Sequence, residues 1–245
     1  MKVIVAREPE AVAHKAAKRI LACVRSTPHP SIGLATGGTQ SGIYRLLIDA
    51  YQRGEVSFAH TIFFMLDEYT GVVPDSPHSF QHTLRTRFLC HVDAPADALR
   101  VLDGNAPDLS VEAERFEQAL ADQGGIDLQL LGIGTNGHIG FNEPGSPFDS
   151  RTREVELHED TRISNATYFS SISEVPRHAI SQGIGTIMEA REILLMAKGL
   201  HKAPAVQAMI DGDVDSDHPA SILQRHPDTT VIVDAAAASL LSTKV

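Results

Sequence analysis

The stretch "ATGGTQSGIYRLL", residues 35–47, joins the pieces of one structural unit. It continues the apolar run Ser31–Ala35, turns at two glycines, and leads into Ser41–Arg53, which has a helical pattern and is followed by Gly54. A strand, a glycine turn and a helix in this order are typical of the βα unit from which α/β proteins are built.

The same alternation continues along the whole chain, and the apolar runs suit strands that are covered on both faces. The predicted strands are Lys2–Ala6, Ser31–Ala35, Thr61–Leu66, Ile126–Gly132, Glu192–Ala197 and Thr229–Val233. The predicted helices are Pro9–Arg25, Ser41–Arg53, His78–Cys90, Val111–Gln123, Val175–Ala190, His201–Ile210 and Ala235–Leu241. We therefore expect an α/β fold with a doubly wound, mainly parallel sheet and helices on both faces.

Length and charge narrow the function classes. The chain has 245 residues without an internal repeat, low-complexity tract or linker, so we expect one domain over residues 1–245. Apolar residues make up 42% of it, which suffices for a packed core. The formal net charge of -10 argues against nucleic acid or an anionic membrane as a partner, because both attract clustered positive charge.

Targeting signals and cysteines both indicate a cytoplasmic protein. No apolar run reaches the roughly 18 residues of a membrane-spanning helix, and the N-terminal segment turns polar too early for a signal peptide. Cys23 and Cys90 have no C-x-x-C partner, which fits a reducing compartment.

Reactive residues follow the predicted strands. Ligands of open α/β sheets bind beyond the carboxyl ends of the strands. Thr36–Thr39 follows one strand, Asp67–Gly71 follows the next, and Lys198 and Lys202 follow a later one. The sequence therefore predicts a site at this edge of the sheet.

The glycine turn Gly37-Gly38-Thr39 suits an anion, because backbone N–H groups and the positive end of a helix dipole converge there. The Walker pattern is absent, so a nucleoside triphosphate is not indicated. An ordinary tight turn between a strand and a helix explains these residues equally well.

Asp67 follows directly on an apolar strand. A carboxylate in such a partly dry place has a raised pKa and can accept a proton near neutral pH. A bracing role, in which the carboxylate caps a helix or a loop, is an equally good interpretation.

The stretch "LGIGTNGHIGFNEPG", residues 131–145, contains G-x-G-x-x-G, the fingerprint of a dinucleotide-binding turn. That fingerprint has to open a helix, whereas Pro144 and Pro147 leave no room for one before Glu156. The dinucleotide interpretation therefore fails.

What remains of this stretch is a turn that presents Asn136, His138, Asn142 and Glu143. A histidine with a nearby carboxylate can form an oriented acid–base pair, which the position at a strand end favours. A histidine satisfied by the backbone is the alternative.

Metal sites are not predicted. His78 and His82 are four residues apart but lack the glutamate of H-E-x-x-H and a third ligand. Asp213, Asp215 and Asp217 lack the glycine and the final glutamate of a calcium loop.

Several motifs taken together are similar to those of glucosamine-6-phosphate deaminases, in the same order and spacing over essentially the whole chain. These motifs are "GLATGGTQ", "LDEYTG", "LLGIGTNGHIGFNEPGS", "HEDTRISNA" and "GLHKA". The resemblance implies a Rossmann-like fold, related to 6-phosphogluconolactonases and to sugar-phosphate-sensing domains of some bacterial repressors.

The resemblance also implies a reaction without metal or organic cofactor, in the breakdown of amino sugars. His138, helped by Glu143 and Asn136, would move the proton that opens the sugar ring. Asp67 would take the C2 proton and return it at C1 through an enediol-type intermediate, and ammonia and fructose 6-phosphate would result. The phosphate would be held by Gly37, Gly38, Thr39 and Lys202.

Some positions depart from this pattern. Asn136 stands where some members have aspartate, and Thr167 stands where members usually have an arginine that grips the phosphate. Arg162 is the candidate substitute for that arginine. The short C-terminal tail is similar to that of the family members without allosteric regulation. The oligomeric state stays open between a monomer and a homo-oligomer.

Three alternatives stay open. A 6-phosphogluconolactonase typically reads "DER" where this chain has Asp67-Glu68-Tyr69. A deaminase of another amino-sugar phosphate would share the motifs. A non-catalytic sugar-phosphate sensor would usually lose the acid–base residues that are present here.

Overall fold

The computed structural model describes residues 1–242, and a seven-stranded sheet of order β1-β10-β9-β6-β2-β3-β5 forms its centre. Every strand pair in this sheet is parallel, so the predicted fold class is confirmed. The strands are β1 (Lys2–Ala6), β2 (Ser31–Leu34), β3 (Ile62–Met65), β5 (Leu99–Arg100), β6 (Leu128–Leu131), β9 (Glu192–Ala197) and β10 (Thr229–Asp234).

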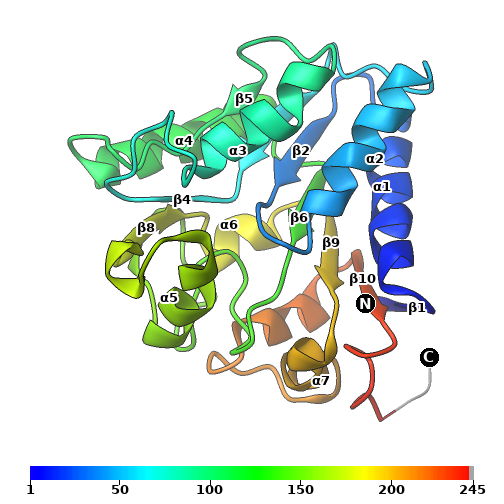
Figure 1. Ribbon diagram of the computed structural model, residues 1–245, viewed down its shortest axis with the longest axis vertical. Coiled ribbons are helices and arrows are strands. Elements are labelled where there is room, and N and C mark those ends of the chain that lie inside the picture. Colours follow the sequence, from blue (N-terminus) through cyan, green and yellow to red (C-terminus); the bar gives the residue numbers. More distant parts are fainter. Residues whose placement is uncertain (243–245) are drawn as a thin grey trace.

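Helices cover both faces of this sheet. In Figure 1, α1 and α2 lie together on one side of β2, while α3 and α4 lie on the other side. The helices are α1 (Pro9–Ser26), α2 (Ser41–Gln52), α3 (Phe80–Arg87), α4 (Leu109–Gln123), α5 (Glu159–Asn165), α6 (Ile184–Met188) and α7 (Ala203–Asp211). Short 3-10 helices are η1 (Leu89–His91), η2 (Ala166–Tyr168), η3 (Ile172–Glu174), η4 (Leu200–Lys202) and η5 (Pro219–Arg225).

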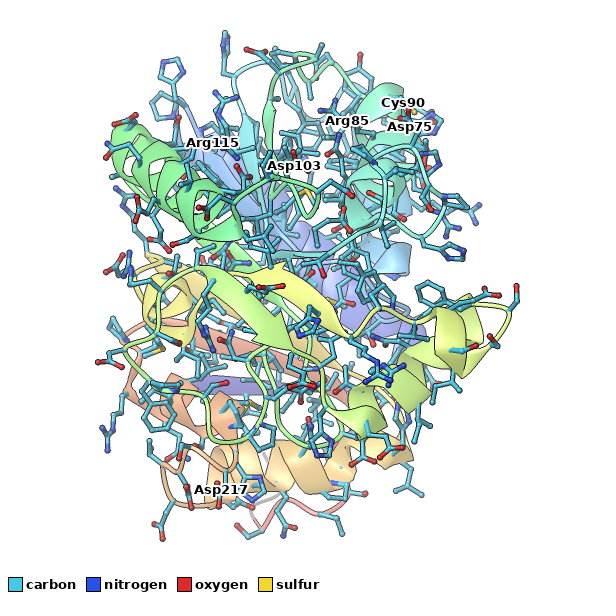
Figure 2. The ribbon with its side chains drawn as sticks, turned by 90° about the vertical axis from the view of Figure 1, so that its left-hand side faces the viewer. Asp75, Arg85, Cys90, Asp103, Arg115 and Asp217 are labelled. Carbon is cyan, nitrogen blue, oxygen red and sulfur yellow. The ribbon has the colours of Figure 1, made fainter. Side chains whose placement is uncertain are left out.

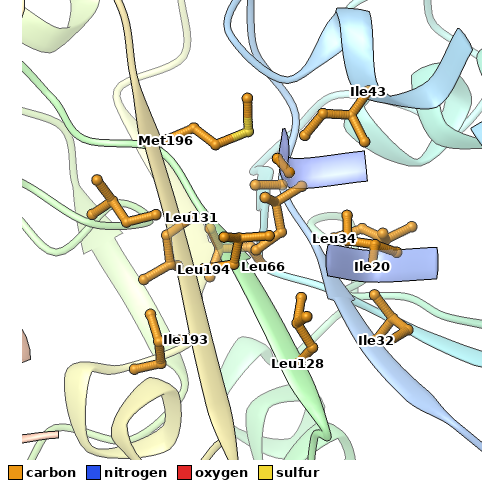
Figure 3. Packing of buried hydrophobic residues seen from close by; sticks show 14 of the residues in the cluster. Ile20, Ile32, Leu34, Ile43, Leu66, Leu128, Leu131, Ile193, Leu194 and Met196 are labelled. Atoms are coloured by element: carbon orange, nitrogen blue, oxygen red, sulfur yellow. The ribbon is translucent and has the colours of Figure 1, made fainter. Parts of the chain in front are cut away.

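The core lies between the sheet and these helices. Ile20 of α1 and Ile32 and Leu34 of β2 are almost completely buried and lie close together in Figure 3. Leu128 and Leu194 continue the same layer on β6 and β9. Burial of such side chains stabilises the fold by roughly 1.5–3 kcal/mol each, which keeps the edge of the sheet that carries the polar loops rigid.

A second sheet was not predicted from the sequence. It is antiparallel, has the order β4-β8-β7, and consists of β4 (Asp67–Tyr69), β7 (Arg153–Glu156) and β8 (His178–Ser181). In Figure 1, β4 and β8 lie near α5, on the side of the molecule away from α1.

The predicted helix Val175–Ala190 is wrong. Its first half forms β8, whose backbone is paired on one side with β4 and on the other with β7. Gly183 ends this strand at a place where a Cβ atom would lie 2.1 Å from the backbone oxygen of Ser150, and α6 begins only after it. Pairing on both edges of β8 overrides the local preference for helix.

Two other predicted helices differ from the structure at positions where a side chain caps the backbone. Asp108, and not Ser110, caps α4, since its carboxylate accepts hydrogen bonds from the N–H groups of Ser110 and Val111. The predicted helix Ala235–Leu241 is a series of turns. These turns begin where the Asp234 carboxylate accepts from the N–H of Ala237.

Candidate active site

A cavity of about 460 Å³ lies where β2 and β6 end. These two strands are neighbours, but the chain runs from β2 to β3 on one side and from β6 to β9 on the other. In doubly wound sheets, ligands bind at such a switch point. The residues that line the cavity include Gly37, Gly38, Thr39 and Gln40 after β2, Asp67 on β4, Gly134 and His138 after β6, Thr161, Ser164, Asn165 and Tyr168 on α5 and η2, and Lys198, His201 and Lys202 after β9.

Most residues predicted from the sequence meet in this cavity. Asn136 and Glu143 do not line it but contact His138 from behind. Arg162 does not line it either, because its guanidinium donates to the backbone oxygens of Ile172 and Val175. The structure thus offers no support for Arg162 as the substitute for an arginine at position 167.

Asp67 reaches the cavity because the chain leaves β3 and enters β4 at this residue. Only 9% of its surface is exposed, and no described residue of 1–242 forms a hydrogen bond with its carboxylate. Burial, followed by the nearby charge of Glu68, raises the pKa of Asp67 to about 8. A carboxylate with this pKa is matched to proton abstraction near neutral pH.

The bracing role belongs to Glu68. Its carboxylate accepts hydrogen bonds from the Ser79 hydroxyl at 2.7 Å and from the N–H groups of Tyr69, Phe80 and Gln81. Ser79, Phe80 and Gln81 lie at the start of α3, so these hydrogen bonds connect the end of β4 to that helix. Burial still raises the pKa of Glu68, although the donors oppose the shift. Glu68 therefore holds the strand, and Asp67 stays available to a substrate.

His138 is oriented by a network behind it. Its Nδ1 lies 2.8 Å from Oδ1 of Asn136, and Nδ2 of Asn136 donates to Glu143 at 2.7 Å. Nδ1 also lies 3.4 Å from the Glu143 carboxylate. The Nε2 atom has no hydrogen-bond partner among the described residues, so it is the nitrogen that a substrate can use.

Glu143 stays ionised in this network. Burial alone would favour its neutral form, but the hydrogen bond and charge of His138, with donors from Thr161 and Asn136, lower the pKa of Glu143 to about 2. The amide of Asn136 thus connects the Glu143 carboxylate to the imidazole of His138.

Gly134 makes room for the His138 ring. A Cβ atom on Gly134 would lie 2.3 Å from both Cε1 and Nδ1 of the imidazole, so the ring would have to move. We expect Gly134→Ala to lower kcat/KM by about 10- to 100-fold, since displacement of a catalytic group by an ångström is that harmful. Steady-state kinetics check this.

Gly42→Ala is the control for this variant, because its Cβ atom would meet Ala13 at an ordinary 3.4 Å. It should keep full activity. Equal activity of the Gly134→Ala and Gly42→Ala proteins would show that the His138 ring tolerates the shift.

Another group of lining residues suits an anion. The glycine turn contains Gly37, whose positive φ of 134° favours glycine, and Lys198 and Lys202 line the same cavity. Neither lysine forms an ion pair within residues 1–242, and burial lowers the pKa of Lys202. Lysines without an ion-pair partner beside a glycine turn at the start of a helix are typical of a phosphate site.

Some lining residues were not selected from the sequence. Gln40 is buried and packs against Gly132, where a Cβ atom would lie 2.5 Å from its Nε2. His201 and Tyr168 line the cavity from short 3-10 helices. Gln40 could have been selected from the sequence because it directly follows the glycine turn. No sequence pattern indicated that Tyr168 would line the cavity.

The described residues contain no cluster of three or more side chains that could hold a metal ion. His78, a rejected metal candidate, stacks on Phe169 with 4.3 Å between the ring centres. No described helix is both long and apolar enough to span a membrane. Cys23 and Cys90 are free thiols, and Cys90 is exposed; Figure 2 labels it at the upper edge of the molecule.

Comparison with known proteins shows the family of this chain. Residues 7–232 match the family described as glucosamine-6-phosphate isomerases/6-phosphogluconolactonase. The glucosamine-6-phosphate deaminase of Bacillus velezensis is 46% identical over 97% of this chain and 99% of its own. That of Corynebacterium aurimucosum is 48% identical over 98% of this chain and 94% of its own.

Solved structures of the same family have the same fold as this chain. A monomeric glucosamine-6-phosphate deaminase superposes with a TM-score of 0.96 at 44% identity, covering 98% of this chain and 100% of its own. A 6-phosphogluconolactonase from Trypanosoma cruzi shares the fold at a TM-score of 0.78 and 22% identity, covering 99% and 97%. The chain therefore belongs to the family of glucosamine-6-phosphate isomerases and 6-phosphogluconolactonases, and within it to the glucosamine-6-phosphate deaminases.

Proposed function

We propose that this protein converts glucosamine 6-phosphate and water into fructose 6-phosphate and ammonia. One observation carries the proposal. One cavity is lined both by a proton-accepting carboxylate and an oriented imidazole, and by a glycine turn and two lysines that form no ion pair within residues 1–242. An amino-sugar phosphate has its reacting carbons and its phosphate at opposite ends, so it matches both. The names of the relatives support this substrate.

In the proposed reaction, the phosphate binds to the turn Gly37-Gly38-Thr39 and to Lys202. Nε2 of His138 then moves the proton between the ring oxygen and O1, which opens the pyranose to the aldehyde. Its Nδ1–H remains on Asn136 throughout, because Glu143 fixes the orientation of that amide.

Asp67 acts on the open chain. Its carboxylate takes the proton from C2, and the electron pair of that C–H bond forms the enediol-type intermediate. The proton then returns to C1, which leaves an imine at C2. Water adds to this carbon, and ammonia departs, so that a ketone remains. Separate groups for carbon and heteroatom protons let each pKa suit its own step.

A lactonase is the second candidate, since family members of that activity share the fold. Lactone hydrolysis needs water activation but no proton acceptor for a carbon acid. The buried Asp67 with its raised pKa favours the deaminase over the lactonase. A sensor would need neither this carboxylate nor the network of His138.

The experiment incubates the purified protein with glucosamine 6-phosphate and measures ammonia and fructose 6-phosphate. We expect equal amounts of both products. Parallel reactions with galactosamine 6-phosphate and with 6-phosphogluconolactone define the substrate class. Lactone hydrolysis without ammonia release would replace the proposal by the lactonase, and binding without turnover of any substrate would replace it by the sensor.

The cellular setting follows from this substrate. We propose a cytoplasmic enzyme of amino-sugar breakdown, because phosphorylated sugars are formed and consumed inside cells. All groups of the proposed reaction belong to one chain, which supports action as a monomer. Size-exclusion chromatography of the active protein tests the oligomeric state.

A further inference from the structure

Tyr168 lies at the phosphate end of the cavity. It is the last residue of η2, and its side chain lines the cavity together with the glycine turn. A methyl group in place of the Gly38 hydrogen would lie 3.2 Å from the phenolic oxygen. The Tyr168 hydroxyl is thus close enough to the turn for both to contact one bound oxyanion.

Contacts on either side hold Tyr168 in this place. Asn165 donates from Nδ2 to the hydroxyl of the buried Tyr69 at 2.8 Å. The ring of Phe169 stacks on His78 and packs edge-on against Tyr69. The residues before and after Tyr168 are therefore fixed to β4 and to the segment that leads into α3, although 59% of Tyr168 is exposed.

The side chains of Thr167 and Arg162 in the same segment are engaged by backbone oxygens. The hydroxyl of Thr167 donates to the backbone oxygen of Ser164 at 3.3 Å, and Thr167 is exposed. Arg162 is occupied by two backbone oxygens. Among these side chains, Tyr168 alone brings a hydrogen-bond donor to the glycine turn. Lys198 and Lys202 also line the cavity and supply positive charge there.

We infer that Tyr168 is a phosphate-binding residue, whose phenol donates a hydrogen bond to a phosphate oxygen held above Gly38. The inference rests on the proposed function only for the identity of the sugar, since any phosphate monoester that occupies the turn would receive this bond. A phenol suits the role because hydrogen bonds to charged oxygens are about twice as strong as neutral ones.

The test is Tyr168→Phe, which removes the hydroxyl and keeps the ring. We expect KM for glucosamine 6-phosphate to rise about 10-fold with kcat within 2-fold, the usual effect of one hydrogen bond to a charged group. The affinity for inorganic phosphate, measured by calorimetry without any turnover, should fall by a similar factor. Tyr51→Phe, at the far end of α2, is the matched control and should behave like the unmodified protein.

The outcomes separate the two proposals. Equal phosphate affinity of the Tyr168→Phe and unmodified proteins would overturn the inference and leave the deaminase untouched. A lower kcat at unchanged KM would also overturn it, because Tyr168 would then act in the chemical steps. If the unmodified protein fails to release ammonia but Tyr168→Phe still weakens phosphate binding, the inference stands and the deaminase falls.

Discussion

Asp67→Asn is expected to lower kcat by about 10³- to 10⁴-fold, the upper range of general base catalysis. The amide has the shape of the carboxylate but cannot accept the C2 proton. Because no described residue of 1–242 hydrogen-bonds to the Asp67 carboxylate, the exchange disturbs no network. Affinity for glucosamine 6-phosphate should therefore stay within a few-fold, as calorimetry can show.

Asp75→Asn is the matched control, since Asp75 is exposed at the outer end of the molecule (Figure 2). It should keep full activity. In deuterated water, the unmodified protein should incorporate deuterium into the sugar carbons, and the Asp67→Asn protein should not. An Asp67→Asn protein with normal turnover would remove Asp67 from the chemistry.

The same variant should be more stable than the unmodified protein at high pH. Burial raises the pKa of Asp67 from 3.8 to about 8 in the folded state. The stabilisation from its protonated form is complete below about pH 3.8 and is lost as the pH rises through 8. The difference in unfolding free energy should thus grow between pH 4 and 8 in favour of asparagine. Urea unfolding at pH 5 and 9 measures it.

His138→Gln should reduce kcat/KM by about 10²- to 10³-fold. The residual rate is expected because sugars open spontaneously in water, so the variant can still use the small amount of free aldehyde. At high concentrations of the variant, the rate should therefore stop increasing with enzyme, since ring opening in solution becomes limiting. Progress curves at increasing enzyme concentration check this.

His60→Gln provides the control, because His60 is exposed at the amino end of β3, away from the cavity. A His138→Gln protein whose rate rises in proportion to its concentration would contradict a role in ring opening. Deuterium incorporation at C1 of the product should persist in this variant, unlike in Asp67→Asn, because Asp67 is intact.

The parallel sheet and the acid–base residues could be predicted from the sequence because both depend on local signals. Apolar runs such as Ile126–Gly132 and Glu192–Ala197 correspond to β6 and β9 within about a residue at their carboxyl ends. Since parallel strands end at one edge, residues that directly follow them meet in space. This is why Asp67 and His138 could be placed in one cavity without any knowledge of contacts.

The small antiparallel sheet could not be predicted, because its strands β4, β7 and β8 are short and stabilised by partners far along the chain. Asp67 pairs with Ser181, which in turn pairs with Arg153. The division of roles between Asp67 and Glu68 depends on Ser79 for the same reason. Tyr168 was missed because only the fold of α5 and η2 brings it to Gly38.

The junction of β2 and β3 has a consequence for substrate length. Leu34 pairs with Met65, and the N–H of Leu66 donates to the oxygen of Leu34 at 3.1 Å. The glycine turn Gly37-Gly38-Thr39 follows β2, and Asp67 follows β3. Because these two strands are hydrogen-bonded to each other, the distance between the turn and Asp67 cannot change without breaking these hydrogen bonds. We expect this fixed separation to select the length of the sugar, so that a sugar with one carbon fewer between phosphate and amine would present the wrong carbon to Asp67.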